Sequence, residues 1–347
     1  MDFYRRVLFP LLGIVYSLTS PTASQSDTPF YPPSPEEAFR SIIVGDSYIL
    51  IGSTTSVHRI NPTSLALEDS RMLGAANRML VTDPGGTYSG SVLVCTSLEC
   101  TLTPINNLTD MRWQVPNGGS NGVIRRAGTE NVLGSFAPGA NGTSSLSFGE
   151  QQASVDPSAI TRGNLVNVNV TGSSFFIRYA TQSEADRFTP REFLATFNTQ
   201  GFIYFIVRIG VLINGMQVDQ LRVVRFCQED SGSSVTSQFV SHFELVAKCS
   251  GSLSSIPTAA TYIGTSSVFG ADTFLVAFMA ESNGGNARVQ HLCAFDVNTI
   301  NARMMQKFSD CLNGNGLSGF SRDREQMSCP AMLSTAQIVS AISDLES

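Results

Sequence analysis

The sequence SIIVGDSYILIGSTTSVHRINPTSLAL, residues 41–67, shows in short form the pattern that decides the fold. Four short β-prone runs, 41–44, 48–51, 56–60 and 65–67, are separated there by Gly-Asp, Gly-Ser-Thr-Thr and Asn-Pro-Thr-Ser. Residues of these types supply the backbone conformations that tight turns need. We therefore expect a small meander of four antiparallel strands in this stretch.

The same pattern of short β-prone runs separated by turn residues continues toward the C-terminus. Further β-prone runs follow at 78–82, 91–95, 100–104, 123–125, 131–136, 165–170, 174–179, 201–207, 211–213, 220–226, 238–247 and 273–279. Between 117 and 152 the chain is rich in Gly, Asn and Ser, which predicts loops around short strands. Many short strands with regular turns are typical of a β-sandwich or a β-propeller, and because no strict repeat motif is visible, the pattern alone leaves both open.

One later segment has the periodicity of a helix. Its apolar residues recur at every fourth position, at Ile300, Met304, Phe308 and Leu312. Asn298 or Thr299 can cap the start and Gly314 can end it, so we expect a helix over about 298–313 whose apolar stripe packs on the core. A second stripe, Ile338, Ile342 and Leu345, follows.

The first 24 residues have the features of a secretory signal peptide. Arg5 and Arg6 form a basic start, Val7 to Leu18 an apolar run, and Thr22-Ala23-Ser24 a cleavage zone of small residues. The alternative, a retained anchor, needs an apolar run of roughly 20 residues. We expect an extracellular chain with signal peptide 1–24, a Pro-rich lead-in 25–36 and a folded part 37–347.

Composition restricts the class of partner. Charged residues make up 14% of the chain, where about a quarter is usual. The formal net charge is −6, and the longest basic block is the pair Arg125-Arg126. A surface that follows phosphate groups needs clustered Lys and Arg, so we expect no nucleic-acid partner.

Seven cysteines bear on the redox state: Cys95, Cys100, Cys227, Cys249, Cys293, Cys311 and Cys329. In an exported chain most of them should pair, because the secretory route allows disulfides to form and persist. The odd number leaves one thiol free, paired between chains, or missing its partner.

Three Asn-X-Thr sequons, at Asn107, Asn141 and Asn169, are candidate N-glycosylation sites; Asn141 lies in the loop-rich stretch, whereas Asn169 falls in an expected strand.

Motifs that suggest catalysis lack their structural context. The G-x-G-x-x-G match at 314–319 follows a helix instead of a buried strand, and the G-x-S-x-G match at 118–122 has neither the strand before it nor the helix after it. His58, His242 and His291 show no paired spacing for zinc. We expect no enzyme, no small-molecule substrate, no cofactor and no metal.

Three blocks resemble the plexin-type sema domains of the semaphorin, plexin and hepatocyte growth factor receptor superfamily. The first is Asn77 to Asp83 with Val92 to Cys95 and Cys100. The second joins Val223 to Asp230, Phe239 to Leu245 and Cys249. The third runs from Leu292-Cys293-Ala294-Phe295 through Ile300-Asn301 and Cys311 to Gly314, Gly316 and Cys329. Semaphorins share the fold, but the second block here lacks their Arg-Asn-Asp and Trp-Thr-rich features.

The resemblance implies three disulfides: Cys95 with Cys100, Cys249 with Cys293, and Cys311 with Cys329. In the family, the cysteine at the position of Cys227 pairs with one about twelve residues beyond the position of Cys329. Because 331–345 contains no cysteine, the resemblance implies that Cys227 is unpaired through loss of its partner.

The resemblance also implies fold and function. The fold would be all-β, an incomplete sema-type β-propeller of about five of the seven four-stranded blades, with the helix near 298–313 inserted. The function would be that of a plexin-like receptor ectodomain fragment that binds a semaphorin-type protein or a second copy of itself, attached to a membrane only through a segment absent from this chain. A secreted semaphorin-like ligand or adhesion protein is the alternative, and a secreted hydrolase on a propeller is a third reading with no credible nucleophile, base or metal set.

Overall fold

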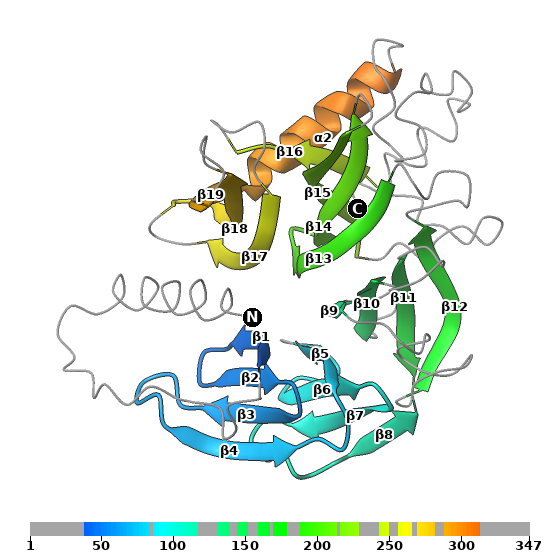
Figure 1. Ribbon diagram of the computed structural model, residues 1–347. Coiled ribbons are helices and arrows are strands. Elements are labelled where there is room, and N and C mark those ends of the chain that lie inside the picture. The colour runs from blue at the N-terminus through cyan, green and yellow to red at the C-terminus, as the bar shows by residue number, and fades with distance from the viewer. Residues whose placement is uncertain are drawn as a thin grey trace. The chain divides into compact units, whose positions relative to one another are not determined.

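The computed structural model describes residues 38–83, 86–116, 131–138, 144–151, 159–166, 169–178, 188–213, 216–228, 243–249, 256–265, 269–281 and 288–312. They form five antiparallel sheets and one helix, labelled in Figure 1. The chain divides into two compact units: unit 1 contains 1–82 and 88–127, and unit 2 contains 83–87 and 128–347. The expected signal peptide and lead-in, the run 123–125 and the stripe at 338–345 lie outside the described residues.

Unit 1 is built of two four-stranded meanders. The first sheet has the order β1 (Phe39–Val44), β2 (Ile49–Ser53), β3 (Ser56–Ile60) and β4 (Leu67–Met72). The second has the order β5 (Asn77–Thr82), β6 (Ser91–Thr96), β7 (Glu99–Pro104) and β8 (Trp113–Pro116). The predicted meander at 41–67 is therefore confirmed.

The expected strand at 65–67 was misplaced, because β4 begins at Leu67 and runs to Met72. Leu65 has a φ of 55° and belongs to the turn that the Asn61 side chain organises by accepting hydrogen bonds from the Thr63 and Ser64 amides. Strand β4 is polar and partly exposed, so an apolar pattern does not reveal it.

The core of unit 1 lies between its two sheets. Its buried residues are Leu50, Val57, Leu73, Leu80, Val92, Val94, Ile105 and Leu108. They come from β2, β3, β5 and β6, from the segment between β4 and β5, and from the loop after β7. Each such side chain contributes about 1.5–3 kcal/mol when fully removed from water.

Unit 2 contains three sheets. The first has the order β9 (Asn131–Pro138), β10 (Ser144–Gln151), β11 (Ala159–Val166) and β12 (Asn169–Arg178). The second has β13 (Phe188–Thr199), β14 (Phe202–Ile213), β15 (Met216–Cys227) and β16 (Phe243–Ala247). The third has β17 (Ile256–Thr265), β18 (Asp272–Glu281) and β19 (Arg288–Asp296), and helix α2 (Val297–Leu312) follows it.

The middle sheet of unit 2 is buried on both faces. On β14, Ile203, Phe205 and Val207 point into a cluster that includes Ala137 of β9, whereas Tyr204 and Ile206 join a cluster with β18 and α2. This double burial explains why 202–213 is almost continuously apolar. We expected two separate strands, at 201–207 and 211–213; the structure instead has one strand, β14, of 12 residues.

Helix α2 confirms the expected helix near 298–313. Val297, Ile300 and Met304 are buried in the cluster shared with the middle sheet. The expected caps were wrong by two or three residues: the Asp296 carboxylate accepts hydrogen bonds from the Asn298 amide and the Thr299 hydroxyl, at 2.9 and 2.8 Å. Because Asp296 also ends β19, the strand leads directly into the helix.

Candidate functional site

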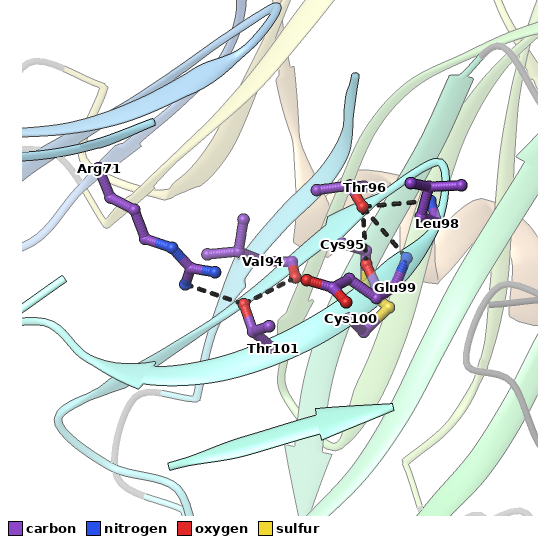
Figure 2. The surroundings of a disulfide bond; sticks show 8 residues. All are labelled: Arg71, Val94, Cys95, Thr96, Leu98, Glu99, Cys100 and Thr101. Atoms are coloured by element: carbon purple, nitrogen blue, oxygen red, sulfur yellow. Dashed lines mark hydrogen bonds between the residues drawn. A yellow bond between two sulfur atoms is a disulfide. The ribbon is translucent and has the colours of Figure 1, made fainter. Parts of the chain in front are cut away.

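The hairpin of β6 and β7 is closed by a disulfide (Figure 2). Cys95 and Cys100 lie opposite each other in the strand register, with their Cα atoms 4.0 Å apart, and both are fully buried. This is the first pair that the resemblance implied.

The loop of this hairpin is fixed by Thr96. Its Oγ1 accepts hydrogen bonds from the amides of Leu98 and Glu99, at 3.2 and 3.1 Å, and donates to the Glu99 carbonyl at 3.1 Å. Figure 2 shows Leu98 at the tip of this loop, where it is 65% exposed. The sequence thus presents an apolar side chain on a loop whose backbone is held locally.

Arg71 of β4 ties the first sheet of unit 1 to this hairpin. Its Nη1 donates to Thr101 Oγ1 at 3.0 Å and its Nη2 lies 3.0 Å from the Met111 sulfur. Burial lowers the pKa of the Arg71 guanidinium, and the negative charge of Glu99 opposes that shift. The arginine therefore acts as a link between sheets.

The second block predicted from the sequence surrounds Arg225 on β15. This side chain is 1% exposed, and its Cζ lies 4.1 Å from the Phe202 ring centre and 5.3 Å from that of Phe243. Its Nη1 donates to Asn301 Oδ1 at 2.7 Å, which also accepts from the Tyr204 hydroxyl at 2.8 Å. No carboxylate pairs with it in the part of the chain that the structure describes.

Burial shifts the pKa values of two residues in this cluster, Arg225 and Tyr204. It lowers the pKa of Arg225, an effect that Tyr204 and Cys227 partly offset, and it raises the pKa of Tyr204. Facing rings stabilise a buried guanidinium through cation–π attraction. The arginine joins β15 to α2.

A polar network continues from Asn301 to the third sheet. Asn301 Nδ2 donates to Gln200 Oε1 at 3.0 Å, and Gln200 Nε2 donates to Asp272 at 3.2 Å and to Asn298 at 3.0 Å. Gln200 and Gly201 both have positive φ, 52° and 78°, which suits the two-residue turn between β13 and β14. The turn thereby carries a side chain that connects α2 with β18.

Asp272 is the acceptor at the other end of this network. The Thr199 and Tyr262 hydroxyls donate to its carboxylate at 2.6 and 2.5 Å. Partial burial and the bond to Asp272 raise the pKa of Tyr262 to about 12. Through these two hydroxyls, Asp272 links β18 to β13 and β17.

The second disulfide joins Cys249, just after β16, to Cys293 on β19, across 44 residues. It is the pair that the resemblance implied, and it links the second and third sheets of unit 2. Cys227 ends β15 opposite Phe202, is half-buried, and belongs to neither disulfide. The pairing of Cys311 with Cys329 stays a prediction, because Cys329 lies outside the described residues.

Several other sequence candidates can be placed. Asn107 lies exposed in the loop between β7 and β8; Asn141 lies outside the described residues, and of Asn169 the structure describes the backbone at the start of β12. His58 is buried with its Nε2 2.6 Å from Ser56 Oγ, and His291 is exposed on β19. His242 and the glycine motifs at 118–122 and 314–319 lie outside the described residues.

Metal-ligating clusters and membrane-spanning helices are both absent from the described residues. No group of three or more His, Cys, Asp or Glu side chains there could hold a metal ion. Within the same ranges, no helix has the length and apolar character to cross a bilayer.

No family model matches the sequence, and no curated protein matches it. Among solved structures, the chain is similar to Drosophila Plexin A in complex with Semaphorin 1b, with 16% identity, 77% of this chain and 53% of that chain covered, and a TM-score of 0.52. It is also similar to extracellular domains 1–2 of Drosophila Semaphorin 1b, with 16% identity, coverage of 81% and 54%, and a TM-score of 0.52. A third similar structure contains extracellular domains 1–2 of Drosophila Semaphorin 1a, with 15% identity, coverage of 80% of this chain and 55% of that chain, and a TM-score of 0.50.

The chain therefore spans about half the length of these structures. The likeness shows the fold: the five small antiparallel sheets are blades of a sema-type β-propeller, as the resemblance implied. Four of these sheets have four strands and the last, β17 to β19, has three.

Proposed function

We propose that this chain is an extracellular protein-recognition module, a plexin-like receptor ectodomain fragment that binds a semaphorin-type protein. The observation that carries the proposal is the sema-type fold together with the Cys249–Cys293 link between its blades. Export through the leader 1–24 and the Cys311–Cys329 bridge are parts of the same proposal. Disulfides are typical of chains that fold in an oxidising compartment, which supports an extracellular location.

Exposed apolar side chains on loops support a recognition role. Leu98 is 65% exposed on the disulfide-closed hairpin. In unit 2, Phe269 is 46% exposed beside Gly270 in the turn before β18. Met and Phe are enriched in protein interfaces, and a loop fixed before binding loses little conformational freedom.

A secreted semaphorin-like ligand or adhesion protein is the second candidate. It is favoured by the similarity of the chain to structures of Semaphorin 1b and Semaphorin 1a as well as to the complex of Plexin A with Semaphorin 1b. The two candidates differ in the partner: a receptor fragment binds semaphorins, whereas a ligand binds plexins.

The test is a binding measurement on the chain secreted from eukaryotic cells and shown to be folded by circular dichroism. Immobilised chain is exposed to soluble semaphorin ectodomains in one arm and to plexin ectodomains in the other. Saturable binding of a semaphorin supports the proposal, and binding of a plexin supports the second candidate. A folded chain that binds none of them contradicts both.

Substitutions locate the surface. Phe269→Glu and Leu98→Glu each place a charge on a loop tip, and either should weaken binding at least tenfold if its tip is buried in the complex, since a buried unpaired charge is costly. Thr63→Glu, at an exposed position in the turn before β4, is the matched control and should leave the affinity unchanged.

A further inference from the structure

The loop between β7 and β8 holds its acceptor tripeptide in a defined local conformation. The carboxamide Oδ1 of Asn107 accepts hydrogen bonds from the Thr109 hydroxyl at 2.8 Å and from the Thr109 amide at 3.3 Å. Among the described residues, Asn107 Nδ2 has no acceptor, and both Asn107 and Thr109 are exposed. The nitrogen that a glycan would occupy therefore belongs to an exposed side chain, and within the described residues it makes no hydrogen bond that modification would break.

The contacts that shape this tripeptide are local. They join residues two positions apart, so they can form before the rest of unit 1 has folded. An Asx-turn of this kind places the hydroxyl of the sequon against the carboxamide of its asparagine. The tripeptide is thus organised in the folded protein, and its contacts are local enough to form in the nascent chain.

The surrounding loop is anchored to the outer edge of unit 1. Leu108 is fully buried, and its amide donates to Asp69 Oδ2 of β4 at 2.8 Å. The Thr103 hydroxyl donates to the Asp110 carbonyl at 2.6 Å. Asn107 is consequently fixed next to β4 and a few residues before β8, and each of these strands is the last of its sheet.

This edge exposes apolar side chains. Leu67 and Met72 of β4 are 50% and 69% exposed, and Met111 in the anchored loop is 51% exposed. An edge strand offers unpaired backbone groups to other chains, and proteins usually protect such edges. The charged and polar residues of β4 give partial protection.

We propose that Asn107 carries an N-linked glycan and that this glycan shields the edge formed by β4 and β8. In the transfer, Asn107 Nδ2 forms a bond to the anomeric carbon of a lipid-linked oligosaccharide. The bond from that carbon to the diphosphate oxygen breaks, the lipid diphosphate leaves, and one amide proton is released. The inference rests on the proposed extracellular function, and it places any protein partner on a face away from this edge.

The test uses the full chain secreted from eukaryotic cells, with site occupancy measured by peptide mass spectrometry after enzymatic deglycosylation in heavy-oxygen water. We expect most molecules to be modified at Asn107. Asn107→Gln and Thr109→Ala should each lose one glycan from the intact mass, whereas Thr109→Ser, which keeps the hydroxyl, should retain it. Asn106→Gln changes the exposed neighbour outside the sequon and should have no effect.

Two further arms separate the possible failures. If the native leader gives no secreted protein, the proposed location fails, and the same chain behind the signal peptide of a known secreted protein still decides occupancy at Asn107. Secreted chain that is unmodified at Asn107 overturns the inference.

Shielding of the edge is measured by sedimentation. The variants Asn107→Gln and Thr109→Ala should self-associate more than the wild type and Asn106→Gln. Equal self-association of all four proteins would overturn the shielding half of the proposal.

Discussion

Strand β15 buries two arginines on opposite faces, and the protein compensates the two charges differently. Arg222 is 2% exposed and forms an ion pair with Glu244 of β16, with 3.0 Å between Nη1 and Oε2. Arg225 is 1% exposed and is held by two aromatic rings and the Asn301 amide. The comparison shows that a carboxylate lies against the arginine on one face, whereas aromatic rings and a side-chain amide lie against the arginine on the other.

The largest expected effect comes from removing the counter-charge on the first face. Glu244→Gln leaves Arg222 charged and buried, and breaking such a pair costs about 3–5 kcal/mol. Urea denaturation of the secreted chain should show this loss in the free energy of unfolding. The double variant Arg222→Met with Glu244→Leu should recover most of it, because neither charge remains.

The disulfide between Cys249 and Cys293 lies just after β16, so it stabilises the same strand as the ion pair between Arg222 and Glu244. In the chain-entropy treatment, a link closing a loop of 44 residues contributes about 4 kcal/mol. The link between Cys95 and Cys100, with a separation of 5, should contribute about 2 kcal/mol. To test this order, each cysteine pair is replaced by two serines and the free energy of unfolding is measured. A larger loss of that free energy on removing Cys95–Cys100 than on removing Cys249–Cys293 would contradict the order.

Arg225→Met should have a smaller effect than Glu244→Gln. It removes the ring contacts and one hydrogen bond but leaves no stranded charge, so we expect a loss of about 1–3 kcal/mol. Arg225→Lys keeps the charge but not the planar group that lies over Phe202, so it should lose at least as much free energy of unfolding as Arg225→Met. If Arg225→Met costs as much as Glu244→Gln, the proposed contrast between the faces is wrong.

The smallest effect concerns pH. The pKa of Tyr262 is raised from 10.0 to about 12 in the folded chain, so its contribution to stability is complete below pH 10 and is lost as the pH rises toward 12. Denaturation midpoints measured from pH 8 to 12 should fall across this window. In Tyr262→Phe the fall should be shallower, with Tyr204, whose pKa is also raised, accounting for part of the remainder.

The sequence predicted elements whose signal is local. The four-residue spacing of Ile300 and Met304 predicted α2, and the turn residues between 41 and 67 predicted the first meander. Strand β13 was missed although Phe193, Ala195 and Phe197 alternate as buried residues, because Pro190 and the charged residues after it disguise the pattern. Strand β17 was missed because small residues fill it.

The polar contacts could not be predicted from one sequence. Arg222 meets a residue 22 positions away, and Arg225 meets Asn301 across 76 positions, so no local spacing points to either partner. The two disulfides present in the structure were predicted through the family resemblance, since seven cysteines allow many pairings.

The central claim is that an exported chain forms sema-type blades locked by the bond between Cys249 and Cys293. Peptide mapping of the secreted protein without reduction tests it most directly. The account predicts one linked peptide containing Cys249 and Cys293 and another containing Cys95 and Cys100. Reduced thiols at these four positions, or a bond that joins either pair to the other, would contradict it.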